Sequence, residues 1–198
     1  MKIAFFSSTR GTNLQSFIDA KAAGELPDVK IACLVTDKAD CGAVGKALEA
    51  KIPVHVFDSA GKTRERFDQE VMEILEPYKI DLIVLGGYMR IIGPEMLKRY
   101  ENKILNVHPS LLPKHAGGMN LDVHKAVIDA GEKETGMTIH LVTETVDAGP
   151  VVCQKKVAVE PEDTPETLKT KVQALEKEWY PKVVQDFADG KIKLTSLL

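Results

Sequence analysis

Short apolar runs and amphipathic segments alternate along the first half of this chain. The apolar runs predict strands at Lys2–Ser7, Lys30–Thr36, Pro53–Phe57, Asp81–Leu85 and Ile104–His108. Apolar residues at helical spacing predict helices at Asn13–Ala23, Cys41–Ala50, Arg64–Pro77 and Pro94–Tyr100. This order predicts an α/β fold: a doubly wound, mainly parallel sheet with helices on both faces.

The second half continues with a helix at Asp122–Ala130 and strands at Gly136–Val142 and Val151–Val159. Thr164 and Pro165 begin the last helix, as an N-cap residue and a proline at the first helical position. Because the sequence shows no repeat, low-complexity segment or linker, we expect one domain spanning residues 1–198.

Composition is that of an ordinary globular protein, with 44% apolar and 28% charged residues and a net charge of −3. The absence of a basic block disfavours nucleic-acid binding, and no apolar stretch is long enough for a membrane span. The N-terminus does not resemble a secretory signal, and the three cysteines form no Cys-x-x-Cys pair. We therefore expect a cytoplasmic protein with buried thiols.

Three segments rich in glycine or polar residues follow predicted strands: Ser8–Asn13, Gly86–Ile92 and Asn106–Pro113. In open α/β sheets, ligands bind beyond the carboxyl ends of the strands. We therefore expect these three segments to share one cleft.

Asn106, His108 and the downstream Asp147 are the side-chain types that transfer of an acyl group between nitrogens needs. An amide can donate to a developing oxyanion, an imidazole can move protons, and a carboxylate can fix the tautomer of that imidazole and raise its pKa. The alternative interpretation is that His108 is a structural histidine and that Asp147 only forms the turn before Gly149. Ser110 lies in no Gly-x-Ser-x-Gly elbow, and no His-Glu-x-x-His motif suggests zinc.

The turn before the first predicted helix can bind a phosphate, because backbone N–H groups and the helix dipole favour an anion there. An ordinary turn capped by Thr12 fits the same residues. In the second segment, Gly86 and Gly87 let a flat ligand approach the backbone. Arg90 fits either a ligand contact or a solvated surface charge.

Together these segments resemble the phosphoribosylglycinamide formyltransferase family, purine-pathway enzymes that use a formyl-folate. The resemblance runs from Lys2 to about Gly190. The motif Asn-x-His-Pro-Ser-Leu-Leu-Pro at 106–113, with the downstream aspartate, marks the wider formyl-folate transferase superfamily. The Gly-Thr-Asn turn at 11–13 and the last helix narrow it to the glycinamide ribonucleotide branch.

The resemblance implies a role for each matching residue. The ribonucleotide site is implied at Gly11, Thr12, Asn13, Gln173 and Glu176, with Glu176 on the ribose hydroxyls. The folate site is implied at Arg64, Met89, Arg90, Ile91, Ile92 and Asn106, with the loop Thr143–Asp147 closing over the pterin. Asn106, a protonated His108 and Asp147 are implied to be catalytic.

The implied reaction moves the formyl group of N10-formyltetrahydrofolate directly to the amine of 5-phosphoribosylglycinamide, without a metal. The expected partners are these small molecules, and not nucleic acid or a membrane. The protein is expected to be a monomer or a homodimer. Two features depart from the family pattern: Arg10 in the turn, and a longer loop at Lys114–Asp122. The alternatives are a formyltetrahydrofolate hydrolase, a methionyl-tRNA formyltransferase, which needs a further tRNA-binding domain, and a binder without activity.

Overall fold

The computed structural model describes residues 1–119 and 121–192. One seven-stranded sheet forms its centre, with strand order β3-β2-β1-β4-β5-β6-β7. The strands are β1 Lys2–Phe6, β2 Lys30–Thr36, β3 Val54–Val56, β4 Leu82–Leu85, β5 Ile104–His108, β6 Glu134–Leu141 and β7 Val151–Ala158. The helices are α1 Thr12–Ala22, α2 Gly42–Glu49, α3 Arg64–Leu75, α4 Pro94–Arg99, α5 Leu121–Asp129 and α6 Pro165–Ala188, with a short 3-10 helix at Glu76–Tyr78.

The first five strands are parallel, and β6 and β7 extend the sheet in antiparallel fashion. The prediction of a doubly wound, mainly parallel sheet is therefore confirmed. The predicted bounds match those of β2 and β5, and the other predicted helices and strands differ from the structure by a few residues at one or both ends. Within the described residues, none of the helices has the length and apolar character that crossing a membrane requires.

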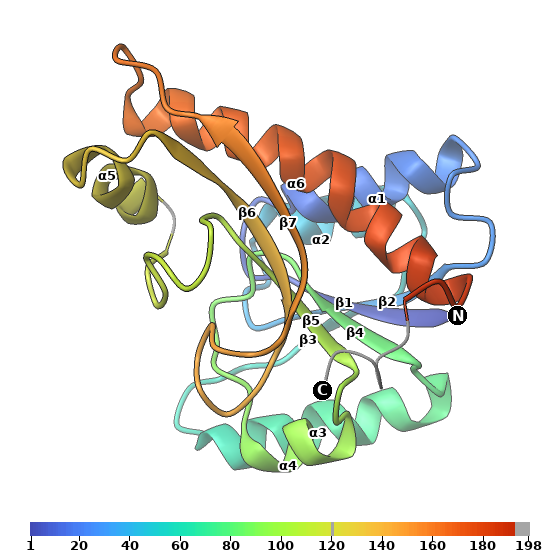
Figure 1. The fold of residues 1–198 in the computed structure, drawn as a ribbon. Helices are drawn as coiled ribbons and strands as arrows, with labels where there is room; N and C mark the ends of the chain where they lie inside the picture. Colours follow the sequence, from blue (N-terminus) through green and yellow to red (C-terminus); the bar gives the residue numbers. More distant parts are fainter. Residues whose placement is uncertain (120, 193–198) are drawn as a thin grey trace.

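Two hydrophobic layers cover the sheet, as Figure 1 shows, with α1, α2 and α6 on one face and α3 and α4 on the other. Alternate residues of β1 illustrate this, because Phe5 packs toward α1 and α6 while Phe6 packs in the layer of α3 and α4. Tyr180 of α6 is fully buried, and its hydroxyl lies 3.1 Å from the Leu85 carbonyl and 3.0 Å from the Leu105 carbonyl. This contact attaches α6 to the strands that lead into the site.

The last helix begins as the sequence predicts. The Thr164 side chain accepts a hydrogen bond from the Thr167 backbone, and the Thr167 side chain accepts one from the Thr164 backbone. This reciprocal cap with Pro165 at the first turn fixes where α6 starts.

Candidate active site

The carboxyl ends of β1, β4 and β5 open into one cavity of about 400 Å³. Residues of all three predicted ligand segments line it, together with residues from the loop before α5, from α5, from β6 and the loop after it, and from α6. The structure thus brings together three segments that begin at Ser8, Gly86 and Asn106, far apart in sequence, because parallel strands place their carboxyl ends at one edge of the sheet.

Asn106 and His108 both come from β5, two residues apart, so their side chains leave the same face of the strand. Asp147 comes from the loop between β6 and β7 and has a left-handed backbone with φ of 55°. Its Oδ2 lies 3.2 Å from His108 Nδ1 and accepts a hydrogen bond of 2.9 Å from the Gly117 backbone. The structure therefore assembles the predicted trio from two distant parts of the chain.

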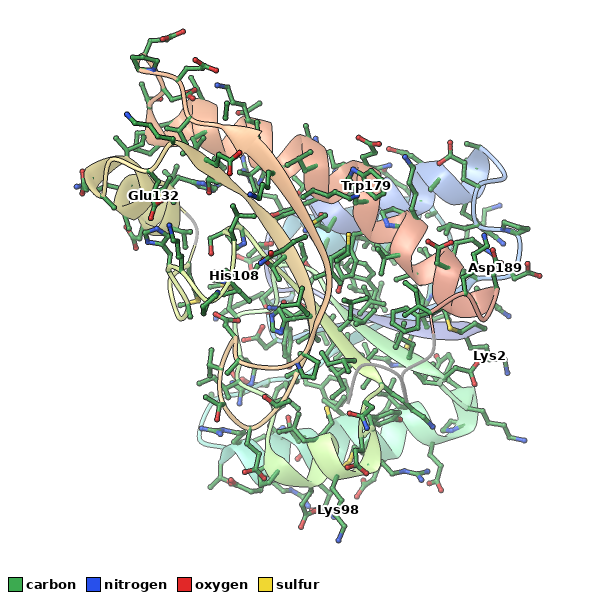
Figure 2. All side chains as sticks on the ribbon, viewed as in Figure 1. Lys2, Lys98, His108, Glu132, Trp179 and Asp189 are labelled. Carbon is green, nitrogen blue, oxygen red and sulfur yellow. The ribbon has the colours of Figure 1, made fainter. Side chains whose placement is uncertain are left out.

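The His108 ring is buried, and both of its nitrogens face oxygen acceptors. Nδ1 faces Asp147, and Nε2 lies 3.1 Å from the His115 carbonyl; Figure 2 shows His108 beside the loop that leads into α5. Burial lowers the pKa of His108 below its usual 6.5, and the Asp147 charge and the His115 carbonyl offset this only in part. The lowered pKa favours the neutral ring at neutral pH, and the protonated His108 that the resemblance implies for the reaction stays a prediction.

Asp147 is ionised beside this ring. Burial alone would raise the pKa of Asp147, but its contacts with His140 and the Gly117 N–H, and the nearby histidine charges, lower the pKa below its usual value. A carboxylate held in this form can stabilise positive charge on His108 when a proton arrives during a reaction.

The sequence did not reveal that His140 of β6 belongs to the site. Its Nδ1 donates to the Leu141 carbonyl at 2.9 Å, and its Nε2 lies 3.1 Å from Asn106 Nδ2 and 3.5 Å from Asp147 Oδ1. The ring is buried and lines the cavity. His140 therefore lies between Asn106 of β5 and Asp147 of the loop after β6, and only the pairing of β5 with β6, which sets Asn106 opposite His140, reveals it.

The predicted ribonucleotide residues gather where α1 meets α6. Thr12, Asn13, Gln173 and Glu176 line the cavity, and Asn13 Nδ2 donates to Glu176 Oε2 at 3.1 Å. Burial raises the pKa of Glu176 to about 7, although the hydrogen bond from Asn13 favours the charged form. This end of the cavity is polar and can bind hydroxyl groups or an anion.

Gly11 supports this end without lining the cavity. It forms the N-cap of α1 in a left-handed conformation with φ of 70°, and a Cβ there would come within 2.7 Å of the Ala43 backbone. A glycine is thus required both by the turn and by the close approach of α2. No side chain caps the start of α1, so its backbone N–H groups stay available to an anion.

The predicted folate residues divide between the cavity and the outer surface. Met89, Arg90, Ile91 and Ile92 line the cavity, and the Arg90 guanidinium lies 4.0 Å above the Phe67 ring. Ile91 is 52% exposed, so this segment presents apolar surface at the cavity mouth. The wall can accommodate a flat, partly apolar ligand.

Arg64 does not join this wall. It is exposed on the first turn of α3, and its aliphatic stem lies against Gly93 rather than in the cavity. The buried Asp68 explains the local arrangement, because its carboxylate accepts the Gly93 N–H at 2.5 Å and attracts both arginines. The resemblance to the family implied a folate contact for Arg64, and this structure places its side chain outside the cavity lining.

The long loop after Pro113 borders the catalytic residues through its backbone. Ser110 Oγ donates to the Lys114 carbonyl at 2.6 Å, and Lys114 Nζ pairs with Glu132 at 2.8 Å. Gly117, Gly118 and Met119 line the cavity, whereas Asn120 lies outside the described residues. Across the described ranges, no group of three or more His, Cys, Asp or Glu side chains is placed to hold a metal ion.

Comparison with known proteins agrees with this geometry. The sequence model of the formyl transferase family matches residues 1–184. A phosphoribosylglycinamide formyltransferase of Haemophilus influenzae is 42% identical over 98% of this chain and 90% of its own. The chain belongs to the phosphoribosylglycinamide formyltransferase family.

Solved structures of family members share the fold as well as the sequence. A phosphoribosylglycinamide formyltransferase from Bacillus halodurans has a TM-score of 0.90 at 40% identity, with 97% of each chain covered. A glycinamide ribonucleotide transformylase from Symbiobacterium toebii has a TM-score of 0.92 at 36% identity, covering 98% of this chain and 90% of that one. A formyltetrahydrofolate deformylase from Pseudomonas syringae is 24% identical with a TM-score of 0.88, which shows a common fold alone.

Proposed function

We propose that this protein transfers the formyl group of N10-formyltetrahydrofolate to the amine of 5-phosphoribosylglycinamide, a step of de novo purine biosynthesis. One observation carries the proposal: a single cavity joins the Asn106, His108 and Asp147 trio to a polar end lined by Asn13 and Glu176 and to the apolar wall after β4. Membership of the family supports the same reaction.

The reaction begins when the glycinamide amine attacks the formyl carbon, forming a new C–N bond and an oxyanion. Asn106 donates a hydrogen bond to the oxyanion. The neutral His108 takes the proton that the attacking amine loses, directly or through water, and Asp147 stabilises the imidazolium. The positive ring then stabilises the oxyanion by charge.

The tetrahedral intermediate collapses when the bond between the formyl carbon and N10 breaks. His108 returns its proton to N10, so protons balance without a metal or a covalent nucleophile. This cycle explains why a ring with a lowered pKa suits the site: it is a base before the attack, and the oxyanion and Asp147 favour its acid form afterwards.

Hydrolysis of the formyl-folate is the alternative, with water in place of the amine. The polar end of the cavity favours the ribonucleotide, because Thr12, Asn13, Gln173 and Glu176 would have no ligand in a hydrolase that needs only folate and water.

A direct test is to incubate the purified protein with both substrates and to follow formylglycinamide ribonucleotide by mass spectrometry. We expect the product from the wild type and its loss in Asn106→Ala and His108→Ala. Absence of the product with the wild type would contradict the proposed reaction.

Three further properties stay predictions. We propose that the protein acts in the cytoplasm, on small molecules and without nucleic acid or membrane partners. We propose that residues 1–198 form one domain, and that the protein is a monomer or a homodimer. Size-exclusion chromatography with light scattering measures the last of these.

A further inference from the structure

One face of α6 presents three polar side chains to the cavity. Lys169, Gln173 and Glu176 are spaced by four and three residues, so they lie along one side of the helix, and all three line the cavity. Gln173 and Glu176 were expected there, but Lys169 was not. The helix therefore brings a positive charge to the site that the family motif does not predict.

Lys169 differs from the other lysines of α6 in its surroundings. Lys171 pairs with Asp163 at 2.6 Å and Lys182 pairs with Glu178 at 2.9 Å, whereas no ion pair of the described residues involves Lys169. Lys169 is half-buried at the cavity wall. A half-buried ammonium with no ion-pair partner at a cavity wall is suited to an anionic ligand.

Neighbouring buried polar atoms point to the same conclusion. His124 of α5 is 1% exposed and lines the cavity, and its Nδ1 has no hydrogen-bond partner among the described residues. Burial, and next the charge of Lys169, lower the pKa of His124 to about 4, so its ring is neutral. Asn13 Oδ1 is likewise buried without a partner. Unsatisfied buried groups are costly, and their presence on two walls of one cavity marks a binding site for a polar molecule.

The uncapped start of α1 indicates the chemistry of that molecule. Its free N–H groups favour an anion, and the Asn13–Glu176 hydrogen bond joins α1 to the same face of α6. Gln173 lies one turn before Glu176 and Lys169 a further turn, so Lys169 lies about 10 Å along the helix axis from the Asn13–Glu176 contact and lines the same cavity.

We propose that Lys169 binds the phosphate group of the ribonucleotide, opposite the start of α1. This inference rests on the proposed function, because it names a further residue for the substrate of that reaction. Lys169 contributes charge to binding and touches no reacting atom, so its loss weakens ribonucleotide binding and leaves the chemical step unchanged.

The test compares Lys169→Met and Lys169→Arg with Lys177→Met, a control on the same helix whose lysine is exposed and does not line the cavity. We expect Lys169→Met to raise KM for the ribonucleotide about tenfold. This factor corresponds to the lower end of the range for a hydrogen bond to a charged group, because Lys169 is only half-buried. We expect kcat and KM for the formyl-folate to change less than twofold. Lys169→Arg should restore most of the affinity, and Lys177→Met should match the wild type.

A substrate analogue that lacks the phosphate isolates the contact. The tenfold penalty of Lys169→Met should vanish with the dephosphorylated glycinamide ribonucleoside. An equal penalty on both substrates, a rise in KM for the formyl-folate instead, or no penalty at all would overturn the assignment.

Calorimetry with ribose 5-phosphate provides a readout that does not depend on turnover. We expect the wild type to bind it about tenfold more tightly than Lys169→Met does. If the wild type makes no formylated product, the proposed reaction fails, while this comparison still decides the role of Lys169. Equal binding by the two proteins would refute that role.

Discussion

Replacing Asp147 with asparagine removes one charge at the centre of the site and keeps the shape of the side chain. The carboxylate Oδ2 lies 3.2 Å from His108 Nδ1. At an effective dielectric constant of about 20, such a charge stabilises an imidazolium by about 4–5 kcal/mol. Because the imidazolium forms only during the reaction, we expect Asp147→Asn to lower kcat roughly 10³-fold.

Steady-state kinetics with both substrates measure this effect. Glu144→Gln is the matched control, because Glu144 is exposed in the same loop and carries the same charge. Glu144→Gln should keep kcat within about twofold of the wild-type value. Both variants should unfold at urea concentrations similar to that of the wild type, because the asparagine oxygen in Asp147→Asn can still accept the Gly117 N–H.

Titration of His108 by nuclear magnetic resonance gives an independent readout. Burial lowers the His108 pKa and Asp147 partly restores it, so Asp147→Asn should lower it further. A kcat within tenfold of the wild type, or a His108 pKa that rises in the variant, would refute the reasoning that Asp147 stabilises charge on this ring.

Three further variants and one control variant test the surroundings of the site. Burial raises the pKa of Glu176 to about 7 from 4.5, so the folded state binds a proton that the unfolded chain releases, and wild-type stability falls as pH rises between these values. The free energy of unfolding of Glu176→Gln should not fall in this way, so in urea unfolding the variant should gain about 3 kcal/mol relative to the wild type between pH 4 and pH 8. Parallel plots of unfolding free energy against pH for the two proteins would contradict this prediction. Gly11→Ala should cost about 2–3 kcal/mol in the same assay, because its Cβ meets backbone of α2. Gly61→Ala, also at positive φ but with nothing within 4 Å, should cost about 1 kcal/mol, and equal costs would count against the contact. His140→Leu should lower kcat roughly 10- to 100-fold in steady-state kinetics by freeing the Asn106 amide, and an unchanged kcat would exclude that role.

Much of the fold could be predicted because each segment carries its own signal. The run at 82–85 is apolar throughout, and β4 is buried on both faces as expected. The reciprocal cap at Thr164 begins α6 where the sequence placed it. The antiparallel addition of β6 and β7 depends on contacts between strands that no local pattern records.

Site residues could be predicted where they directly follow a strand in sequence. They could not be predicted where their position depends on how two strands pair. The carboxyl ends of β4 and β5 meet at one edge, so Arg90 and His108 line one cavity. His140 is found only through its register with Asn106. Arg64 was expected in the site from the family resemblance alone, and it is exposed on the first turn of α3.

The protonation of His108 also lay beyond the sequence. The pairing with Asp147 was expected to raise its pKa, and that contribution is present. Burial outweighs it, and burial depends on the loop at 114–118 and on strands that pack around the ring. The balance of opposing contributions, rather than the presence of either, sets the charge state.

The central claim is that the ribonucleotide amine receives the formyl group, and the absorbance change on folate release tests it most directly. The protein is given the formyl-folate alone, and 5-phosphoribosylglycinamide is then added. Our account predicts no release before the addition and steady release after it. Release without the ribonucleotide would indicate a hydrolase, and no release in either mixture would contradict the transferase account.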